Sequence, residues 1–203
     1  MLAAAEQVIG GQGFHEAGMV EIARVAEVAI GTLYVAFPSK DALYQQLVVS
    51  RAEELAGGCA AALAGGGTER ERLDRALAAK IAFFERHQSF LRIYATTSMV
   101  VNAGWAAPPA VLKLRQETLT LLAQCFREAG ERGGLAVAAD PADLALAFQT
   151  LSTSYLVAAL ASEGRIEPAR IVDSMHAVLL DPVLPAEVPP STRLALRARS
   201  RAS

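Results

Sequence analysis

Residues 30–48, with the sequence IGTLYVAFPSKDALYQQLV, decide the fold of this chain. A short run of apolar and hydroxyl residues stops at Pro38, and a long pattern without helix breakers begins at Lys40. Proline disfavours helical geometry in the residue before it, and Ser39 is a good N-cap. The stretch therefore predicts a short helix, a break and then a long helix.

The composition of the whole chain indicates an all-α protein. The 203 residues are 53% hydrophobic and 20% charged, which excludes disorder over most of the length. Alanine and leucine are abundant, and alternating β-branched runs are scarce. Glycine and proline divide the sequence into about nine helices, of which the first three are short.

This asymmetry predicts a small head, residues 1–47, followed by a larger helical bundle, residues 48–182. Residues 183–203 are rich in proline and then in arginine, and we expect a disordered basic tail there.

Capping and breaking residues set the expected ends of the longer helices. Ser39 starts one helix, which three consecutive glycines stop. Thr68 and Glu71 have the spacing of a capping box, and Asp140 before Pro141 is a strong helix start. We expect these helices over residues 40–63, 68–87, 89–101, 108–129, 140–162 and 168–180.

No motif of catalysis or metal binding occurs in the sequence. Cys59 and Cys125 are far apart without a CxxC pattern, and the three histidines show no ligand spacing, so we expect reduced, buried thiols and no metal or cofactor. A nucleophile elbow, a phosphate-binding glycine loop and an HExxH motif are all missing. We therefore expect no catalytic residue and no enzyme.

One segment has the length of a membrane span. Residues 144–162 are uncharged and could cross a bilayer, but the polar residues at their centre favour a helix buried in a soluble bundle. The N-terminal residues MLAAAEQVIGG lack the basic start of a signal peptide. We expect a cytoplasmic protein without membrane contact.

Three short helices with a tight turn between the second and the third are typical of a helix-turn-helix head, whose last helix lies in the DNA major groove. Residues 19–48, MVEIARVAEVAIGTLYVAFPSKDALYQQLV, resemble the helix-turn-helix of the TetR family of bacterial transcriptional regulators, most clearly in IA, GTLY, FPSK and DAL. The resemblance covers about a quarter of the chain, residues 2–48. It implies a homodimer whose larger domain holds a ligand pocket and the dimer interface.

The resemblance carries DNA-binding positions onto four residues of this chain. Thr32 and Tyr34 match positions that usually touch DNA, and packing is the alternative for Tyr34. Lys40 matches a residue usually placed against a phosphate, and Gly31 matches the small residue that lets the third helix approach the backbone. The chain departs from the pattern in the turn, where Glu27 replaces glycine, and after GTLY, where valine and alanine replace polar or aromatic residues.

The head is acidic, with two cations, five anions and a net charge of −3, in a chain whose net charge is −2. Phosphate neutralisation supplies most nonspecific DNA affinity, so such a head should bind weakly. Three explanations stay open: a basic arm encoded upstream of Met1, cations that face DNA while the acids face away, or a head that has lost DNA binding. The charged residues are Arg24, Lys40, Glu6, Glu16, Glu21, Glu27 and Asp41.

The larger domain is expected to hold the effector and dimer surfaces. Aromatic residues in mid-chain suit a pocket for an apolar or aromatic small molecule, with Trp105 as a lid and ordinary core packing as the alternative. The helices over 144–162 and 168–180 are apolar around most of their circumference, which favours a symmetric four-helix dimer interface. The candidate effector residues are Phe83, Phe90, Tyr94, Met99, Trp105, Phe126 and Tyr155. The candidate interface residues are Phe148, Leu151, Leu156, Ile171, Met175, Val178 and Leu179.

The sequence therefore predicts a ligand-responsive transcriptional repressor. It would bind palindromic double-stranded DNA as a homodimer and be released by a small apolar or aromatic effector. The competing hypothesis is a helical ligand-binding or interaction protein that keeps the head but has weakened or lost DNA binding.

Overall fold

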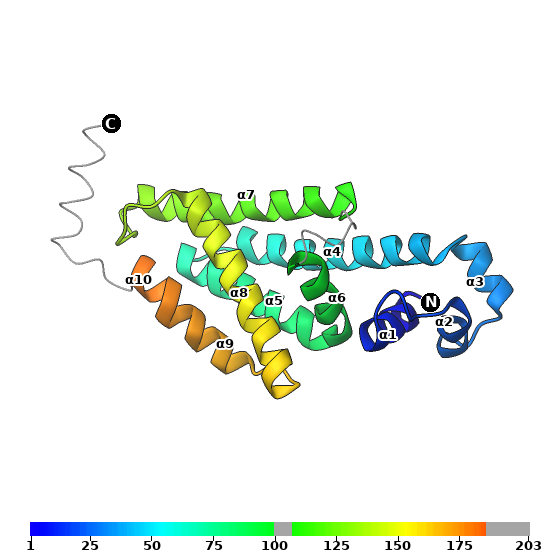
Figure 1. Ribbon diagram of the computed structural model, residues 1–203. Helices are drawn as coiled ribbons and strands as arrows, with labels where there is room; N and C mark the ends of the chain where they lie inside the picture. The colour runs from blue at the N-terminus through cyan, green and yellow to red at the C-terminus, as the bar shows by residue number, and fades with distance from the viewer. Residues whose placement is uncertain (100–106, 186–203) are drawn as a thin grey trace. The chain divides into compact units, whose positions relative to one another are not determined.

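The computed structural model describes residues 1–99 and 107–185, without the side chains of residues 96–99 and 163. This part of the chain is all-α, as predicted, and contains no strand. In chain order the elements are α1 (Leu2–Gln12), α2 (Met19–Val25), α3 (Ile30–Ala36), α4 (Lys40–Ala64), α5 (Glu69–Arg86), α6 (Gln88–Met99), α7 (Pro109–Glu131), α8 (Pro141–Glu163), α9 (Pro168–Met175), the π-helical turn η1 (His176–Leu180) and α10 (Asp181–Val183) (Figure 1). Because α9, η1 and α10 are continuous, the described residues form nine helical segments, the number predicted.

The three predicted N-caps all form. Ser39 Oγ accepts a hydrogen bond of 3.0 Å from the amide three residues later. The amide of Thr68 donates to Glu71 Oε2 at 2.8 Å, and the amide of Glu71 donates to Thr68 Oγ1 at 3.3 Å, which completes the capping box. Asp140 Oδ1 accepts from the amide two residues later at 2.8 Å. These local signals explain why α4, α5 and α8 begin where the sequence indicated.

The last helix runs three residues past its predicted end, to Val183. Proline has no amide hydrogen, and its ring crowds the carbonyl four residues earlier, which normally ends a helix. Here the wider π-helical turn η1 precedes Pro182 and relieves that crowding. The predicted tail lies outside the described residues from residue 186 onward.

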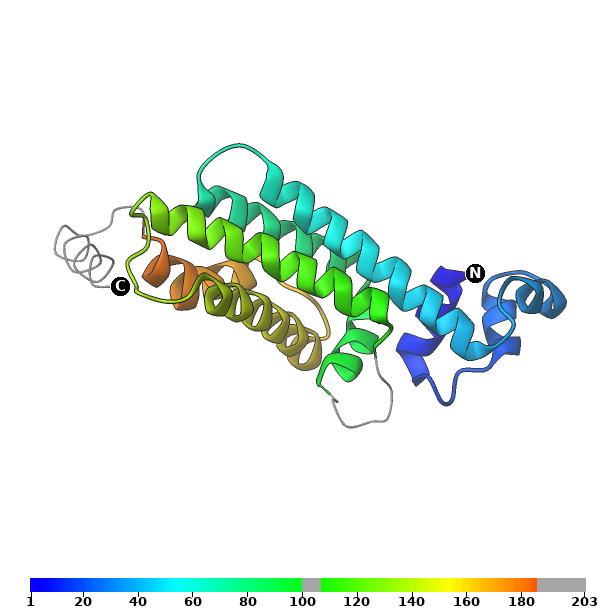
Figure 2. The same cartoon turned by 90° about the horizontal axis from the view of Figure 1, so that it is seen from above.

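The chain divides into two compact units, which we call unit 1 and unit 2. Unit 1 consists of Met1–Ala56 and Phe83–Arg115, and unit 2 consists of Gly57–Ala82 and Gln116–Ser203. In unit 1, α1 packs against α2 and α6, and α2 packs against α3. In unit 2, α8 packs against α9 (Figure 2).

The contact between α1 and α6 is unusually close at Gly10. A Cβ atom added to Gly10 would lie 2.6 Å from the carbonyl oxygen and 2.7 Å from the Cβ atom of Ser89, distances that real Cβ atoms essentially never show. Any other residue at this position would separate the two helices, so the crossing itself requires glycine here.

Both units have apolar cores, and that of unit 2 draws on longer helices. The buried residues of the head include Ala5, Ile9, Ile22, Ala23 and Leu33. Those of unit 2 include Leu63, Leu73, Leu77, Phe126, Phe148, Leu156, Ile171 and Met175. The segment Pro141–Ser162 of α8 is long and apolar enough to cross a membrane by length and composition alone, and 33% of its apolar window is buried inside this chain.

Candidate nucleic-acid interface and effector site

The turn between α2 and α3 has the geometry that a helix-turn-helix requires. The amide of Val28 donates to the carbonyl of Ala23 at 3.0 Å, and the amide of Glu27 donates to the carbonyl of Arg24 at 3.2 Å. This pair of bonds is the Schellman pattern that ends a helix. Glu27 adopts a φ of 54°, in the left-handed region that glycine reaches without steric cost. The turn thus keeps its shape although glutamate stands where glycine is usual.

Helix α3 is anchored by one side chain and exposes most of the others. Leu33 is fully buried in the head, whereas Gly31, Thr32 and Tyr34 are exposed. Successive helix residues are about 100° apart, so Val35 lies nearly opposite Leu33. At 89% exposure it is the most exposed large apolar residue in the described part of the chain. Sequence reasoning missed Val35, although its spacing from Leu33 was the available signal. DNA contact by Gly31, Thr32 and Tyr34 stays a prediction.

Lys40 has a structural role that the sequence did not indicate. Its Nζ donates hydrogen bonds to the carbonyl oxygens of Phe14, His15 and Ala17 at 2.8, 3.0 and 3.0 Å. The same ammonium lies 4.7 Å from the centroid of the Phe14 ring, within cation–π range. These contacts tie the start of α4 to the segment between α1 and α2. Contact between Lys40 and a DNA phosphate stays a prediction.

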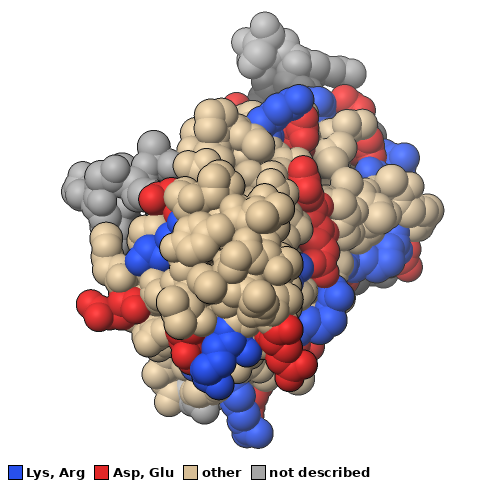
Figure 3. Space-filling model, turned by 90° about the vertical axis from the view of Figure 1, so that its right-hand side faces the viewer, with Lys and Arg blue, Asp and Glu red and all other residues tan. Residues whose placement is uncertain are grey.

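The other cation of the head is paired on the surface. Arg24 Nη2 lies 2.7 Å from Glu21 Oε1, and this hydrogen-bonded pairing lowers the pKa of Glu21 and raises that of Arg24. Figure 3, which faces the right-hand side of Figure 1, shows basic and acidic side chains scattered around a broad uncharged area. No large field of one sign is visible on that face.

One acid of the head belongs to a buried ion cluster inside unit 1. Glu6 of α1 is 6% exposed, and its Oε2 lies 2.7 Å from Nε of Arg51 in α4. His87 lies between two carboxylates, with Nδ1 3.3 Å from Glu6 and Nε2 3.3 Å from Glu54. Arg51 also reaches Glu54 at 3.2 Å. The carboxylate of Glu6 is therefore occupied within the protein and adds little to the surface charge of the head.

Three of the predicted effector residues lie together in unit 1. Phe83, Phe90 and Tyr94 form an aromatic cluster with Phe84; the ring centroids are 6.1 Å apart for Phe83 and Phe90 and 6.2 Å apart for Phe90 and Tyr94. Phe83 and Phe90 are each 2% exposed, and Tyr94 is partly buried. These aromatic side chains pack closely against one another, as ordinary core residues do.

Two of the other predicted effector residues belong to unit 2, and the remaining two lie outside the described side chains. Phe126, which is fully buried, and Tyr155, which is partly buried, belong to unit 2. The side chain of Met99 and the whole of Trp105 lie outside the described residues. Effector binding by all seven residues stays a prediction.

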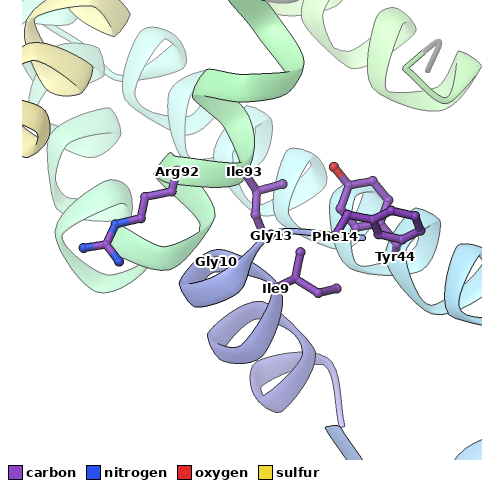
Figure 4. Close-up of a pocket in the computed structure, with 7 residues that line it drawn as sticks. All are labelled: Ile9, Gly10, Gly13, Phe14, Tyr44, Arg92 and Ile93. Atoms are coloured by element: carbon purple, nitrogen blue, oxygen red, sulfur yellow. The ribbon is translucent and has the colours of Figure 1, made fainter. Parts of the chain in front are cut away.

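A cavity of about 240 Å³ lies in unit 1 where α1, α4 and α6 meet (Figure 4). Its volume is below the range of about 300–1,000 Å³ that is usual for small-molecule sites. None of the seven predicted effector residues lines it, and in Figure 4 the Arg92 side chain points away from Phe14 and Tyr44. The lining residues are Ile9, Gly10, Gly13, Phe14, Tyr44, Arg92 and Ile93.

Unit 2 holds a buried lysine that sequence reasoning missed. Lys80 of α5 is 2% exposed, and its Nζ donates to Ser152 Oγ and Thr153 Oγ1 at 2.7 Å each and to the carbonyl of Gln149 at 3.1 Å. Buried polar groups require such partners. Two of the polar residues at the centre of α8, Ser152 and Thr153, are thus explained by Lys80, which supports the interpretation of α8 as a packed helix. The signal was a lysine beside the apolar positions Leu77 and Ile81.

The predicted dimer residues are mostly covered within one chain. Phe148, Leu156, Ile171, Met175 and Leu179 are buried, Leu151 is partly buried, and Val178 is 54% exposed. A different set of α8 residues, spaced by four and therefore on one face, is exposed: Ala142, Leu146, Thr150, Ser154 and Ala158. Dimerisation through α8 and α9 stays a prediction.

The cysteines are free and buried, as expected. Burial raises the pKa of both thiols, that of Cys125 to about 11. Among the described residues, no group of three or more histidine, cysteine or acidic side chains is arranged to hold a metal ion.

The head matches a known protein family. Residues 1–47 match the family model described as bacterial regulatory proteins, tetR family. A curated relative, the HTH-type transcriptional activator FasR of Mycolicibacterium smegmatis, is 34% identical over 107 residues, which are 53% of this chain and 49% of the relative. The match therefore spans about half the length of that relative.

Solved structures share the fold over most of the chain. The fatty acid degradation regulator FadR from Bacillus halodurans has a TM-score of 0.76 and 18% identity, over 88% of this chain and 92% of its own. The transcriptional regulator FadR from Bacillus subtilis in complex with stearoyl-CoA has a TM-score of 0.74 and 15% identity, over 89% and 96%. A TetR-like transcriptional regulator from Rhodococcus sp. RHA1 has a TM-score of 0.69 and 25% identity, over 89% and 91%. The predicted fold is thereby confirmed.

Proposed function

We propose that this chain is a regulator of transcription of the TetR type, and that it is a repressor that binds a palindromic operator as a homodimer and leaves it when an apolar effector binds. Regulation of transcription through a DNA-binding helix-turn-helix follows from the family. The direction of regulation, the operator symmetry and the effector are the proposal. With DNA as its partner, the protein would act in the cytoplasm.

The observation that carries the proposal is the geometry of the α2–α3 corner. The Schellman turn positions α3, Leu33 anchors its inner side, and Gly31, Thr32 and Tyr34 remain exposed on the other sides. A helix that is held in this way can lie in the major groove with its outer side chains at the base edges.

The charge of the head favours modest, base-dependent affinity. Lys40 donates to three carbonyl groups and Arg24 is paired with Glu21, so few cations of the head are available for phosphates. Phosphate contacts supply the salt-dependent part of DNA affinity, at a slope of about −0.9 per phosphate neutralised. We expect a slope between about −2 and −4 for a dimer that makes only one or two such contacts per head.

A dimer through α8 and α9 would cover the exposed face of α8. Most of that face consists of small residues, which allow two helices to approach closely, and Leu146, at 47% exposure, is the larger apolar group on it. Val178 of η1 is also exposed, at 54%. Two copies would form a four-helix interface around a two-fold axis. The two heads would then meet half-sites about one helical turn of DNA apart, or a multiple of that spacing.

The observation that favours an apolar effector comes from a structural neighbour of this chain. The structurally similar FadR from Bacillus subtilis was solved with stearoyl-CoA, so a long-chain acyl-CoA is the first compound class to test. An effector coupled to DNA binding by about 1–3 kcal/mol would lower the affinity about 5- to 150-fold.

The test begins with selection of duplexes from a random pool by the purified protein at low salt. Anisotropy titrations of the enriched duplexes across salt concentrations follow, with and without stearoyl-CoA, and coenzyme A alone is the matched control. We expect a palindrome, a negative salt slope and weaker binding with stearoyl-CoA only. In vitro transcription from a promoter that carries the operator should fall when the protein is added.

Each result separates one part of the proposal from the others. Failure to enrich any duplex would favour the competing hypothesis, a ligand-binding or interaction protein that keeps the head, which the net charge of −3 over residues 1–47 motivates. Binding that ignores stearoyl-CoA would reject this effector class and leave the DNA function standing. A rise in transcription would make the protein an activator, as the relative FasR is named.

A further inference from the structure

We propose that α3 reads DNA through an uncharged surface centred on Gly31 and Val35, and that Val35 contacts the C5-methyl group of a thymine in each half-site. The inference rests on the proposed DNA-binding function and specifies the base that the head recognises.

The position of Val35 on α3 is the first step. Gly31 and Val35 are four residues apart and therefore lie on the same side of the helix, nearly opposite the buried Leu33. Val35 is 89% exposed, so its methyl groups contact little of the protein. Thr32 and Tyr34 flank this line on either side, and both are exposed. The outermost part of α3 is thus a glycine and a valine, with hydroxyl groups at the edges.

Gly31 is the second step, because nothing in the described fold requires glycine there. A Cβ atom added to Gly31 would meet no atom within 4 Å, and the residue has no positive φ. Glycine within a helix is less favourable than alanine by about 1 kcal/mol. A bare backbone on the exposed side of the first turn of α3 fits a surface that comes close from outside, such as the edge of a base pair.

The chemistry of α3 is the third step. Its sequence, IGTLYVA, has none of the side chains whose hydrogen bonds identify one base: arginine and lysine for guanine, asparagine and glutamine for adenine, and acids for cytosine. The hydroxyl of Thr32 can bond to more than one base, so it identifies none by itself. The remaining specific contact of the major groove is the thymine methyl group, which apolar side chains recognise. Val35 is the apolar side chain that stands farthest out on this face.

The same face is less well suited to a protein partner. Protein interfaces are built around large aromatic, methionine or arginine anchors, and here the centre is a glycine and a single valine. The face also lies on α3, within the residues 1–47 that match a family of bacterial regulatory proteins. We therefore commit to duplex DNA as its occupant.

The test replaces each thymine of the selected operator by 2′-deoxyuridine, in both half-sites at once, which removes only the methyl group. Anisotropy then compares the natural protein with Val35→Ala and with Val20→Ala, a matched control because Val20 of α2 is also exposed, at 72%. One methyl group buried per half-site corresponds to a factor of roughly 4, and so to about 15-fold for the dimer.

We expect one position at which deoxyuridine weakens binding of the natural protein and of Val20→Ala about 15-fold, and binding of Val35→Ala hardly at all. Because Val35 is so exposed and alanine is the better helix former, Val35→Ala should melt at or slightly above the temperature of the natural protein. Gly31→Ala should melt a few degrees higher yet bind DNA at least about tenfold more weakly, a pair of opposite signs that a structural role would not produce.

The inference is overturned if no thymine responds to deoxyuridine, or if Val35→Ala responds as strongly as the natural protein. In both cases the selected operator would still establish the proposed function. If no duplex is enriched at all, the proposed function fails together with the inference, and loss of a protein partner on Val35→Ala would then assign the face to protein binding.

Discussion

The head and unit 2 each hold a lysine whose ammonium donates three hydrogen bonds. The lysine of the head stabilises a loop, and that of unit 2 stabilises the packing of two long helices. Lys40 is partly exposed, and its acceptors are three backbone carbonyls of the segment after α1. Lys80 is 2% exposed, and two of its acceptors are hydroxyl groups of α8. In the head, whose helices are short, a side chain fixes the loop between α1 and α2 through its carbonyl groups. In unit 2, a polar group is accommodated within a core built from long helices.

The largest effects are expected from single core deletions in the two regions. Leu33→Ala in the head and Leu73→Ala in unit 2 should each lower the free energy of unfolding by about 3–4 kcal/mol, because both side chains are buried. Leu33→Ala should also abolish operator binding, since α3 loses its anchor. Urea denaturation and DNA anisotropy measure the two quantities. If Leu73→Ala, at temperatures where it is folded, lost DNA binding to the same degree, DNA binding would depend on the core of unit 2 as much as on that of the head.

A smaller effect is expected at Lys40. Lys40→Met should lower the free energy of unfolding by about 1–3 kcal/mol, because three carbonyls lose a charged donor, and Lys40→Arg should lower it less. Salt titrations of DNA binding separate this structural role from phosphate contact. If Lys40 also contacts a phosphate, the salt slope of a dimer should become shallower by about 1.8 in Lys40→Met. An unchanged slope would assign the lysine to the loop alone.

A gain in stability is expected in the turn of the head. Glu27 holds a φ of 54°, so Glu27→Gly should raise the free energy of unfolding by roughly 0.5–1 kcal/mol. The increase should appear in chemical denaturation. Val28→Gly is the contrasting variant. Val28, the next residue, has no positive φ, so glycine there would only add freedom to the unfolded chain and should destabilise the protein.

The smallest effect is expected when the reactivity of the two thiols is compared between the natural protein and Leu33→Ala. Both thiols belong to unit 2. With its pKa raised to about 11, Cys125 should be almost entirely protonated at pH 8, and alkylation by iodoacetamide should be about 100-fold slower than for a thiol of ordinary pKa. The rate should increase as the pH approaches 11. In Leu33→Ala, labelling followed by mass spectrometry should remain slow at pH 8. Rapid labelling there would show that loosening the head also opens unit 2.

The sequence predicted what depends on neighbours along the chain and missed what depends on distant contacts. Ser39, Thr68 and Asp140 are caps whose partners lie two or three residues away, so pattern alone sufficed. Lys40 bonds to residues 23 to 26 positions earlier, a pairing that no local pattern contains. The family resemblance gave the residue a role at the DNA without revealing its role inside the head.

The two surfaces of α8 were hard to separate for a related reason. The helix is apolar around most of its circumference, so periodicity does not distinguish the side that packs within the chain from the side left exposed. Phe148 and Leu156 face inward, whereas Leu146 is 47% exposed. In α3 the two sides can be distinguished. Leu33 is the one buried residue of this short helix, so the side opposite it, where Val35 lies, faces outward.

The contact at Gly10 sets how stiffly the head can be attached to α6. Flexible side chains between two helices act as a cushion, because they change rotamer and absorb small displacements. At Gly10 there is no cushion: backbone faces the backbone and Cβ atom of Ser89 with no room for even a methyl group. In mechanical terms the joint is nearly incompressible, so any displacement of α6 toward α1 must be passed on as movement of α1 itself.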